Sequence, residues 1–178
     1  MNPKYAPLFQ PFTLNNGVTV KNRLAVAPMT HFGSLADGLI SDQERTFLGN
    51  RAGDMGLFIS AATLVQEGGK AFHGQPEATG ENCLDSLKET AQIIQKQGAK
   101  AILQIHHGGS QAMVELNHRD KISASASEKD GAREASAAEV EELIASFAQA
   151  ADLALRAGFD GVEIHGANAY LLQQFVSA

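Results

Sequence analysis

The feature that most constrains the fold of this chain is a regular alternation of short apolar segments with segments of helical character. Four apolar runs have the length and composition of buried strands, at residues 23–29, 56–61, 101–105 and 161–164. Strands that alternate with helices in this way are typical of βαβ units in a parallel sheet. The sequence therefore predicts an α/β fold in which each strand is followed by a loop and a helix.

Recognisable capping residues delimit the expected helices. Ser41, with a glutamate three residues later, forms a capping-box signature for a helix that should run to about Arg51. A second helix is expected over 84–97, and a third begins at the same signature at Ser136 and ends before Gly158. The apolar stripe of this third helix is predicted to comprise Val140, Leu143, Ile144, Phe147 and Ala151.

A hairpin is expected ahead of the first strand. The pair Asn16-Gly17 lies between apolar residues, which is a strong short-range signal for two antiparallel strands joined by a tight turn. This hairpin, within residues 8–22, should close the bottom of the sheet. Because no linker, repeat or low-complexity stretch follows it, residues 1–178 are expected to form one domain.

The composition excludes several classes of protein. Residues are 44% hydrophobic and 19% charged, and no apolar run approaches the roughly 20 residues of a membrane span, so a soluble globular protein with no membrane partner is expected. A net charge of -6 argues against nucleic acid as a partner. The only cysteine, Cys83, fits a reducing compartment, and residues 1–10 lack signal-peptide features, so we expect a cytoplasmic location.

Three polar side chains follow the fourth strand within the segment GFDGVEIHGANAYLLQQF: His165, Asn168 and Tyr170. The carboxyl ends of parallel strands are where α/β proteins bind ligands. The segment resembles the Old Yellow Enzyme family of FMN-dependent oxidoreductases, in which the pattern H-x-x-N-x-Y or H-x-x-H-x-Y follows the fourth barrel strand. The resemblance extends over nearly the whole chain, from PLFQPFTLNNGVTVKNR to LLQQF.

This resemblance implies a (βα)8 barrel of the TIM type. Such a barrel typically needs roughly 250 residues, whereas this chain has 178 residues and four predicted strands. We therefore expect the amino-terminal half of a barrel, truncated to about the first four βα units.

The resemblance also implies which residues contact FMN. Pro28 and Met29 would lie against the flavin ring through their backbone, and the hydroxyl of Thr30 would lie near the ring's C4 oxygen. Ala62 matches a small flavin-contact position, and Gln104 matches the glutamine whose amide pairs with the pyrimidine edge of the ring. Structural explanations stay open for each residue, because Thr30 can bond its own turn and small residues are common at strand ends.

Catalytic roles follow from the same resemblance. His165, which would also contact the flavin, and Asn168 would donate hydrogen bonds to the carbonyl oxygen of an enone-type substrate and stabilise the charge that develops there. Tyr170 would protonate the alpha carbon while the flavin, reduced by NAD(P)H, delivers hydride to the beta carbon. The structural alternative is a turn in which Asn168 caps the next helix and Tyr170 packs with the leucines beside it.

A zinc site and a complete phosphate site are both disfavoured. His106, His107 and His165 are possible zinc ligands, but adjacent strand residues point to opposite faces and no HExxH motif or cysteine cluster completes a set, so we expect no metal. Ser110 stands where the family usually has arginine. The family's basic phosphate-binding residues belong to later strands, so FMN binding by this chain alone is expected to be weak.

Two functions remain in competition at this point. The first is an FMN-dependent NAD(P)H oxidoreductase, an ene-reductase in the complete enzyme. The alternative is a non-catalytic half-barrel or assembly subunit with an incomplete flavin site. A four-stranded sheet would expose its first and fourth strands as edges, so we expect a homo-oligomer that closes eight strands, or a partner that supplies the missing half-barrel.

Overall fold

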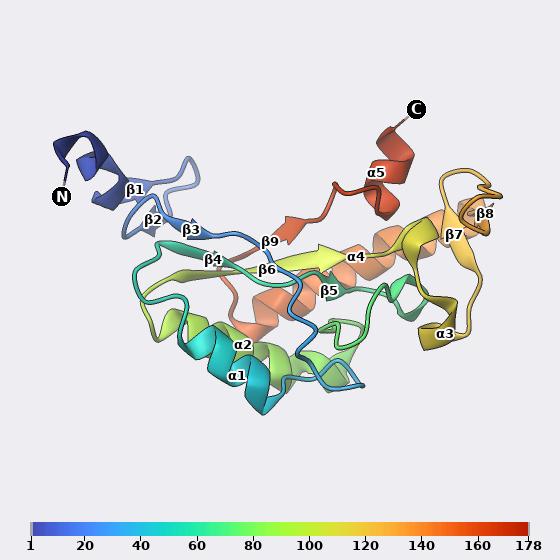
Figure 1. Ribbon diagram of the computed structural model, residues 1–178, viewed down its shortest axis with the longest axis horizontal. Coiled ribbons are helices and arrows are strands. Elements are labelled where there is room, and N and C mark those ends of the chain that lie inside the picture. Colours follow the sequence, from blue (N-terminus) through green and yellow to red (C-terminus); the bar gives the residue numbers. More distant parts are fainter. Residues whose placement is uncertain (1, 178) are drawn as a thin grey trace.

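The computed structural model describes residues 2–177 and contains a parallel sheet with helices along one face (Figure 1). Its four principal strands lie in the order in which they occur along the chain, and each pairs in parallel with the next. They are β3 (Ala25–Val26), β4 (Leu57–Ile59), β6 (Lys100–His106) and β9 (Gly161–Ile164). The predicted α/β class and parallel sheet are confirmed.

Three helices cover one face of this sheet: α1 (Asp42–Gly49), α2 (Leu84–Gln95) and α4 (Ala137–Ala157). The side chains of β6 that point toward them, Ala101, Leu103 and Ile105, are at most 1% exposed and belong to the main hydrophobic core. Alternate residues of a strand point to opposite faces, so Ile102, Gln104 and His106 lie on the other face. The functional side chains discussed below come from that second face and from the loops at its carboxyl end.

The ends of α4 lie where the sequence predicts them. Ser136 and Glu139 form a reciprocal capping box, and Gly158 ends the helix in the left-handed conformation at φ 87°. The predicted apolar stripe is only partly right, because Leu143 is buried but Ile144 is 58% exposed. The carboxyl half of α4 carries most of its buried residues, namely Ala150, Leu153, Ala154 and Ala157.

Two predicted details differ at the amino-terminal side. The strand expected over 23–29 is reduced to Ala25–Val26, because the side chain of Asn22 accepts the Leu24 N–H before it and Pro28 has no N–H to donate after it. The capping box expected at α1 is only half formed. The Ser41 hydroxyl accepts the Glu44 N–H at 3.1 Å, but the Glu44 carboxylate turns toward other partners.

A β-bulge after β4 shapes the edge of the functional face. Between the pairs Ile59↔Ile102 and Thr63↔Ile105, the chain leading from β4 to β5 (Thr63–Leu64) advances four residues while β6 advances three. The extra residue interrupts the ladder, and the Ser60 hydroxyl accepts the Gln104 N–H at 3.0 Å. Ala62 lies within this bulge and is buried.

Smaller elements surround the sheet. The expected hairpin is present as β1 (Phe12–Thr13) and β2 (Thr19–Val20), paired antiparallel after a 3₁₀ segment at Pro3–Phe9. Short 3₁₀ turns also occur at Glu67–Gly69, Glu81–Cys83 and Gly109–Gln111. A short helix, α5 (Leu171–Val176), follows the fourth strand. Three further elements had no sequence prediction: α3 (Val114–Asn117), β7 (Lys121–Ser123) and β8 (Ala132–Glu134).

Both outer strands of the sheet are unpaired on one side within residues 2–177. β3 pairs only with β4, and β9 pairs only with β6. On β9, Ile164 is 60% exposed and Val162 is 37% exposed. Figure 1 shows the hairpin and α5 at opposite ends of the sheet, on the side away from α1 and α2. Across residues 2–177, no helix combines the length and apolar character that crossing a membrane requires.

Candidate active site

A cavity of about 640 Å³ lies at the carboxyl ends of the strands. Its volume is in the range of small-molecule sites, roughly 300 to 1,000 Å³. The wall includes seven of the eight residues to which the sequence assigns a functional role: Pro28, Thr30, Ala62, Gln104, His165, Asn168 and Tyr170. The structure thus brings together side chains from all four βα units, and their roles remain predictions.

His165 is fixed as a neutral hydrogen-bond donor. Its backbone N–H continues the ladder to the Ile105 carbonyl at 3.0 Å, and its ring Nδ1 accepts the Ala167 N–H at 3.4 Å. An Nδ1 that accepts leaves the ring proton on Nε2. Burial lowers the pKa of His165, which favours the neutral ring.

Asn168 lies in a tight turn that other side chains hold in place. Asn168 and Ala169 both have left-handed backbone conformations, at φ 57° and 56°. Asparagine tolerates this conformation, whereas alanine adopts it at an energetic cost. The Gln111 side chain donates to the carbonyl oxygens of both residues, at 3.0 and 2.7 Å. Asn168 does not cap α5, whose N-cap residue is Tyr170.

Tyr170 lies in a cluster of perpendicular rings. Its ring centroid is 5.1 Å from that of His165, at 84°, and 4.3 Å from that of His106, at 83°. Its backbone N–H donates to the Ala167 carbonyl at 3.2 Å. The tyrosine therefore borders the cavity beside His165, as a proton donor to a bound carbonyl compound would have to do.

Gln104 is held by a carboxylate that the sequence did not single out. Its Nε2 donates to Glu163 Oε1 at 2.7 Å, from β6 to the facing position on β9. This bond directs the amide nitrogen to Glu163, and the hydrogen bonds of Gln104 within residues 2–177 do not use its amide Oε1. A free amide oxygen at a cavity wall can accept a bond from a ring N–H of a ligand.

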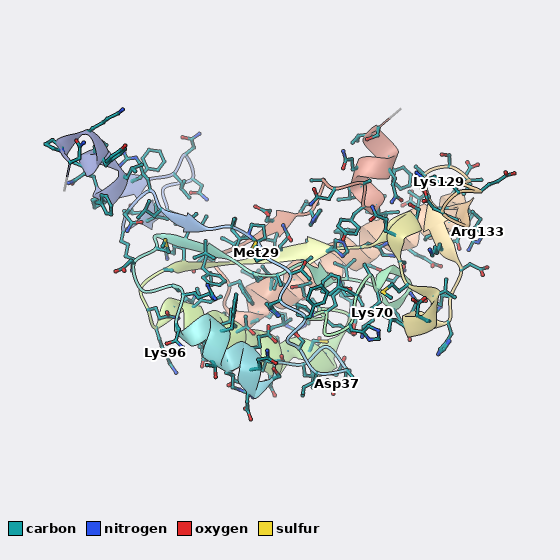
Figure 2. The ribbon with its side chains drawn as sticks, in the orientation of Figure 1. Met29, Asp37, Lys70, Lys96, Lys129 and Arg133 are labelled. Atoms are coloured by element: carbon teal, nitrogen blue, oxygen red, sulfur yellow. The ribbon has the colours of Figure 1, made fainter. Side chains whose placement is uncertain are left out.

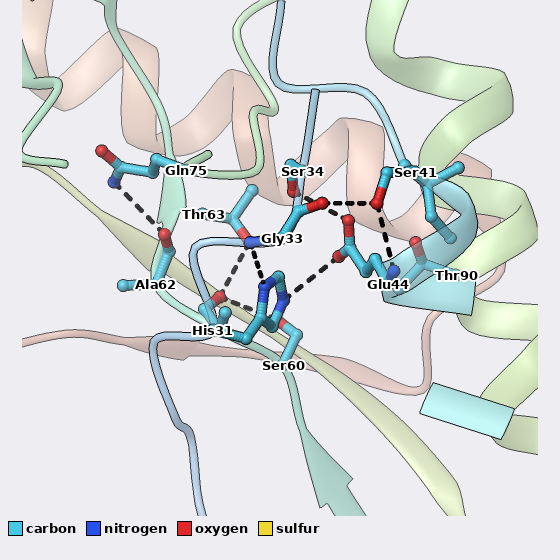
Figure 3. Close-up of polar contacts among 12 residues, drawn as sticks. His31, Gly33, Ser34, Ser41, Glu44, Ser60, Ala62, Thr63, Gln75 and Thr90 are labelled. Atoms are coloured by element: carbon cyan, nitrogen blue, oxygen red, sulfur yellow. Dashed lines mark hydrogen bonds and ion pairs between the residues drawn. The ribbon is translucent and has the colours of Figure 1, made fainter. Parts of the chain in front are cut away.

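The loop that carries Pro28 and Thr30 is tied to the start of α1 (Figure 3). His31 Nε2 lies 3.2 Å from Glu44 Oε1, and the Ser34 hydroxyl donates to Glu44 Oε2 at 2.8 Å. Glu44 is buried, so removing either partner would leave a buried carboxylate short of a hydrogen bond. By contrast, the Met29 side chain is 64% exposed and does not line the cavity (Figure 2).

Ser110, which stands where the family usually has arginine, has a structural role in this chain. Its N–H donates to Gln174 Oε1 at 3.1 Å, and its hydroxyl accepts from Gln174 Nε2 at 3.0 Å. Gln174 Nε2 also donates to the Ala169 carbonyl at 2.6 Å. Ser110 and Gln174 therefore fasten the loop after β6 to α5 and support the turn that contains Asn168.

Sequence reasoning did not assign roles to several residues that build the site. Gln111 and Glu163 line the cavity, while His106 lies behind Tyr170. The sequence offered one usable signal. His106 stands two residues from Gln104 on the same strand, and Glu163 stands two residues before His165, which follows β9 directly, so each shares the face of a predicted site residue. Gln75, which contacts His106, lies in a loop without periodicity and could not be found in that way.

His106 and His107 are both buried and neutral. Burial lowers the pKa of His106 to about 3, with contributions from His165 and His107, and lowers that of His107 to about 4. Nδ1 of His107 accepts the Gly109 N–H at 3.1 Å. Within residues 2–177 the structure has no group of three or more histidine, cysteine, aspartate or glutamate side chains arranged to hold a metal.

This burial predicts that the protein loses stability as the pH falls below about 6.5. Unfolded histidine binds a proton near pH 6.5, whereas His106 and His107 stay neutral until about 3 and 4. The unfolded state therefore binds more protons in this window, and each histidine should lower the unfolding free energy by up to about 1.4 kcal/mol per pH unit. Urea unfolding at pH 7, 6 and 5 measures this slope. His106→Phe should reduce this slope by up to about 1.4 kcal/mol per pH unit, the contribution of one proton. An unchanged slope would contradict the conclusion that His106 is neutral when folded.

The cavity fits the ring of FMN better than its phosphate. The small Ala62 in the bulge and the free oxygen of Gln104 suit a flat heterocycle with a ring N–H. No lysine or arginine of residues 2–177 lines the cavity, and Glu163 adds a carboxylate to its wall. The residues present can hold the ring portion, and a phosphate would need basic groups from elsewhere.

Comparisons with known proteins show which family the chain resembles. A family model described as the NADH:flavin oxidoreductase / NADH oxidase family matches residues 7–178. The chain is 48% identical to the probable NADH-dependent flavin oxidoreductase YqiG of Bacillus subtilis, over 99% of this chain and 49% of the relative. It is 42% identical to the NADH:fumarate oxidoreductase of Klebsiella pneumoniae, over 96% of this chain and 19% of the relative.

Solved structures extend the match to the fold. The Old Yellow Enzyme from Pichia sp. matches with a TM-score of 0.88 at 25% identity, over 96% of this chain and 48% of that one. The sheet described above thus corresponds to about half of a TIM-type barrel, as the sequence predicts. The chain spans about half, or less, of the length of the relatives that it matches.

Proposed function

Because the chain belongs to the NADH:flavin oxidoreductase / NADH oxidase family, we propose that it forms part of an FMN-dependent ene-reductase. The complete enzyme would use NAD(P)H to reduce the C=C bond of α,β-unsaturated carbonyl compounds. The observation that carries this proposal is the convergence of His165, Asn168 and Tyr170 on the cavity that Ala62 and Gln104 also border. Three groups able to donate hydrogen bonds thus face one space.

The neutral His165 and Asn168 would bind the substrate's carbonyl oxygen. His165 carries its ring proton on Nε2, because Nδ1 accepts the Ala167 N–H, and an asparagine amide supplies a second donor. Two donors on one oxygen withdraw electrons from the conjugated C=C bond. They also stabilise the negative charge that grows on the oxygen as the double bond is attacked.

Tyr170 would complete the reaction as the acid. FMN held beside Ala62 and Gln104 would supply hydride-transfer chemistry at the beta carbon, with NAD(P)H as its reductant. The Tyr170 hydroxyl then gives its proton to the alpha carbon, and the product is the saturated carbonyl compound. Solvent returns a proton to the tyrosine oxygen, so one hydride and one proton are consumed in each turnover.

An absorbance spectrum and a coupled assay test this function in the complete protein. We expect one flavin per protein and NAD(P)H oxidation that depends on a cyclic enone under anaerobic conditions. A saturated ketone of the same ring size is the matched control and should not support turnover. Flavin-loaded protein that oxidises NAD(P)H with oxygen or quinones but leaves the enone unreduced would overturn the proposal.

A second possibility is that the 178-residue chain by itself is a non-catalytic assembly unit. Two observations favour it: both outer strands lack a neighbour on one side within residues 2–177, and the described part of the cavity wall carries no lysine or arginine. We propose that a second copy, or a partner that supplies the other half of the barrel, pairs with these edges. A cytoplasmic location is also proposed, supported by the single cysteine.

The 178-residue chain on its own is expected to self-associate and to bind FMN weakly. Besides the two strand edges, an apolar groove of about 300 Å³ lies between α4, β9 and α5, and includes Ile144, Ile164 and Phe175. Sedimentation should show dimers or larger species at micromolar concentration. Ile164→Lys should weaken association, whereas Leu155→Lys, at a position on α4 that is 73% exposed, should not. A monodisperse monomer, or stoichiometric FMN retained through purification, would contradict this expectation.

A further inference from the structure

Gln75 and His106 form a fully buried pair behind the active-site wall. Oε1 of Gln75 accepts the Ala71 N–H at 2.9 Å, and its Nε2 lies 3.2 Å from the Ala62 carbonyl oxygen (Figure 3). The same Nε2 lies 3.0 Å from Nδ1 of His106. Because a backbone N–H can only donate, the oxygen of the Gln75 amide must face Ala71. The NH2 group therefore faces both Ala62 and His106.

This arrangement fixes the protonation of His106. The Gln75 NH2 has no lone pair to offer, so Nδ1 of His106 accepts and the ring proton lies on Nε2. Burial lowers the pKa of His106 to about 3, so the ring is neutral at all pH values at which the protein would work. Among residues 2–177, Nε2 of His106 has no hydrogen-bond partner, and it is closed off from solvent.

Of the aromatic rings that contact the His106 ring, that of Tyr170 has the shortest centroid separation. The two centroids are 4.3 Å apart and the planes are nearly perpendicular, at 83°. The His165 ring is also perpendicular to His106, at 73° and 5.1 Å. Perpendicular contacts of this kind set the positive edge of one ring against the negative face of the other, and an N–H group strengthens them.

On the basis of the proposed function, we propose that Gln75 and His106 are positioning residues for Tyr170. Gln75 fixes His106 as the Nε2–H tautomer, and the His106 ring holds the Tyr170 ring in the orientation from which its hydroxyl reaches the cavity. The same Gln75 amide also holds the carbonyl of Ala62 in the bulge. One side chain thus aligns the small residue on the flavin side of the cavity with the acid on the substrate side.

Nitrogen NMR of the histidine-labelled complete protein tests the tautomer without any activity measurement. We expect Nδ1 of His106 to give the far-downfield signal of an unprotonated ring nitrogen, assigned by its loss in His106→Phe. Gln75→Glu replaces the donor with a carboxylate of similar size, so the proton should move to Nδ1 and that signal should shift upfield. A protonated Nδ1 in the unmodified protein would overturn the proposal, even if the enzyme reduces enones.

Gln97→Glu is the matched control for Gln75→Glu. The side-chain amide of Gln97 also makes three hydrogen bonds. It accepts from the Ala52 N–H at 3.0 Å and donates to the Leu48 and Ile93 carbonyls at 2.9 Å. It lies three residues before β6 begins, at the opposite end of the strand from His106. Gln97→Glu should leave the His106 signal in place, so it separates a local tautomer change from a general loss of stability.

Kinetics then test the positioning role. Gln75→Glu should slow enone reduction about tenfold or more through kcat, with KM changed less than twofold. The rate of flavin bleaching by NAD(P)H should fall by a clearly smaller factor, since Gln75 also bonds the Ala62 carbonyl on the flavin side. Gln75→Met, which removes the donor but keeps the volume, should do the same and serves if the glutamate variant does not fold. Equal losses in both half-reactions, or a tautomer shift without any change in kcat, would refute the role. Absence of enone reduction in the unmodified protein would instead refute the proposed function and leave the NMR result standing.

Discussion

Tyr170→Phe is expected to slow enone reduction by about 100- to 10,000-fold, the usual effect of losing a general acid. The phenylalanine ring keeps the perpendicular contacts with His106 and His165 and removes only the hydroxyl that would give up the proton. Stopped-flow measurement of the two half-reactions in the complete enzyme checks this. The rate at which NAD(P)H bleaches the flavin should stay within about threefold of the unmodified enzyme, because no proton from Tyr170 is needed there.

Tyr5→Phe is the matched control. Tyr5 lies in the 3₁₀ segment at Pro3–Phe9, is 50% exposed and is the other tyrosine of this chain. Its replacement should leave both half-reactions unchanged. Equal slowing of both half-reactions by Tyr170→Phe would show that the residue supports the flavin site as a whole and would rule out its assignment as the acid.

The double variant His165→Ala/Asn168→Ala is expected to lose both hydrogen-bond donors to the substrate's carbonyl oxygen. Removing one such donor typically costs 100- to 1,000-fold in rate, and the two act on the same oxygen, so we expect a combined loss of at least about 1,000-fold in enone reduction. A phenol, whose oxygen would occupy the same position, should give a long-wavelength absorbance band with the oxidised flavin in the unmodified enzyme. The double variant should show no band at the same phenol concentration.

His73→Ala/Asn82→Ala provides the same chemical change at two exposed positions, one in a loop and one in the 3₁₀ turn at Glu81–Cys83, and should keep the band. His165→Gln and Asn168→His keep a donor at each position and should retain part of the phenol affinity. If the double alanine variant bound phenol as tightly as the unmodified enzyme, binding of the ligand oxygen would have to be assigned to other residues that border the cavity, such as Gln111.

Local signals in the sequence predicted those parts of the fold that depend on neighbouring residues. The ends of α4 follow from Ser136, Glu139 and Gly158, each of which acts on backbone groups within one turn. The limits of β9 were predicted to the residue. The clustering of the residues that follow the strands could also be predicted, because the parallel topology gathers the carboxyl ends of all the strands at one edge of the sheet.

Features that depend on distant contacts could not be predicted. The bulge at Ala62 arises from how β4 and β5 register against β6, some forty residues later. Glu44 leaves its capping position because His31 and Ser34 compete for its carboxylate. The same holds for Gln75, whose partner His106 is 31 residues away and whose own segment has no strand or helix period.

The bulge makes the length of the segment 60–62 more important than its exact residues. Deleting one of these three positions has two possible outcomes. If Thr63 keeps its place opposite Ile105, the bulge that contains Ala62 is lost; if the register slips by one residue instead, Thr63 and Leu64, both fully buried, turn to the opposite faces of the sheet. We expect homologous sequences to vary among small residues here while insertions and deletions are absent. A one-residue deletion in this segment should be more harmful than any single substitution within it.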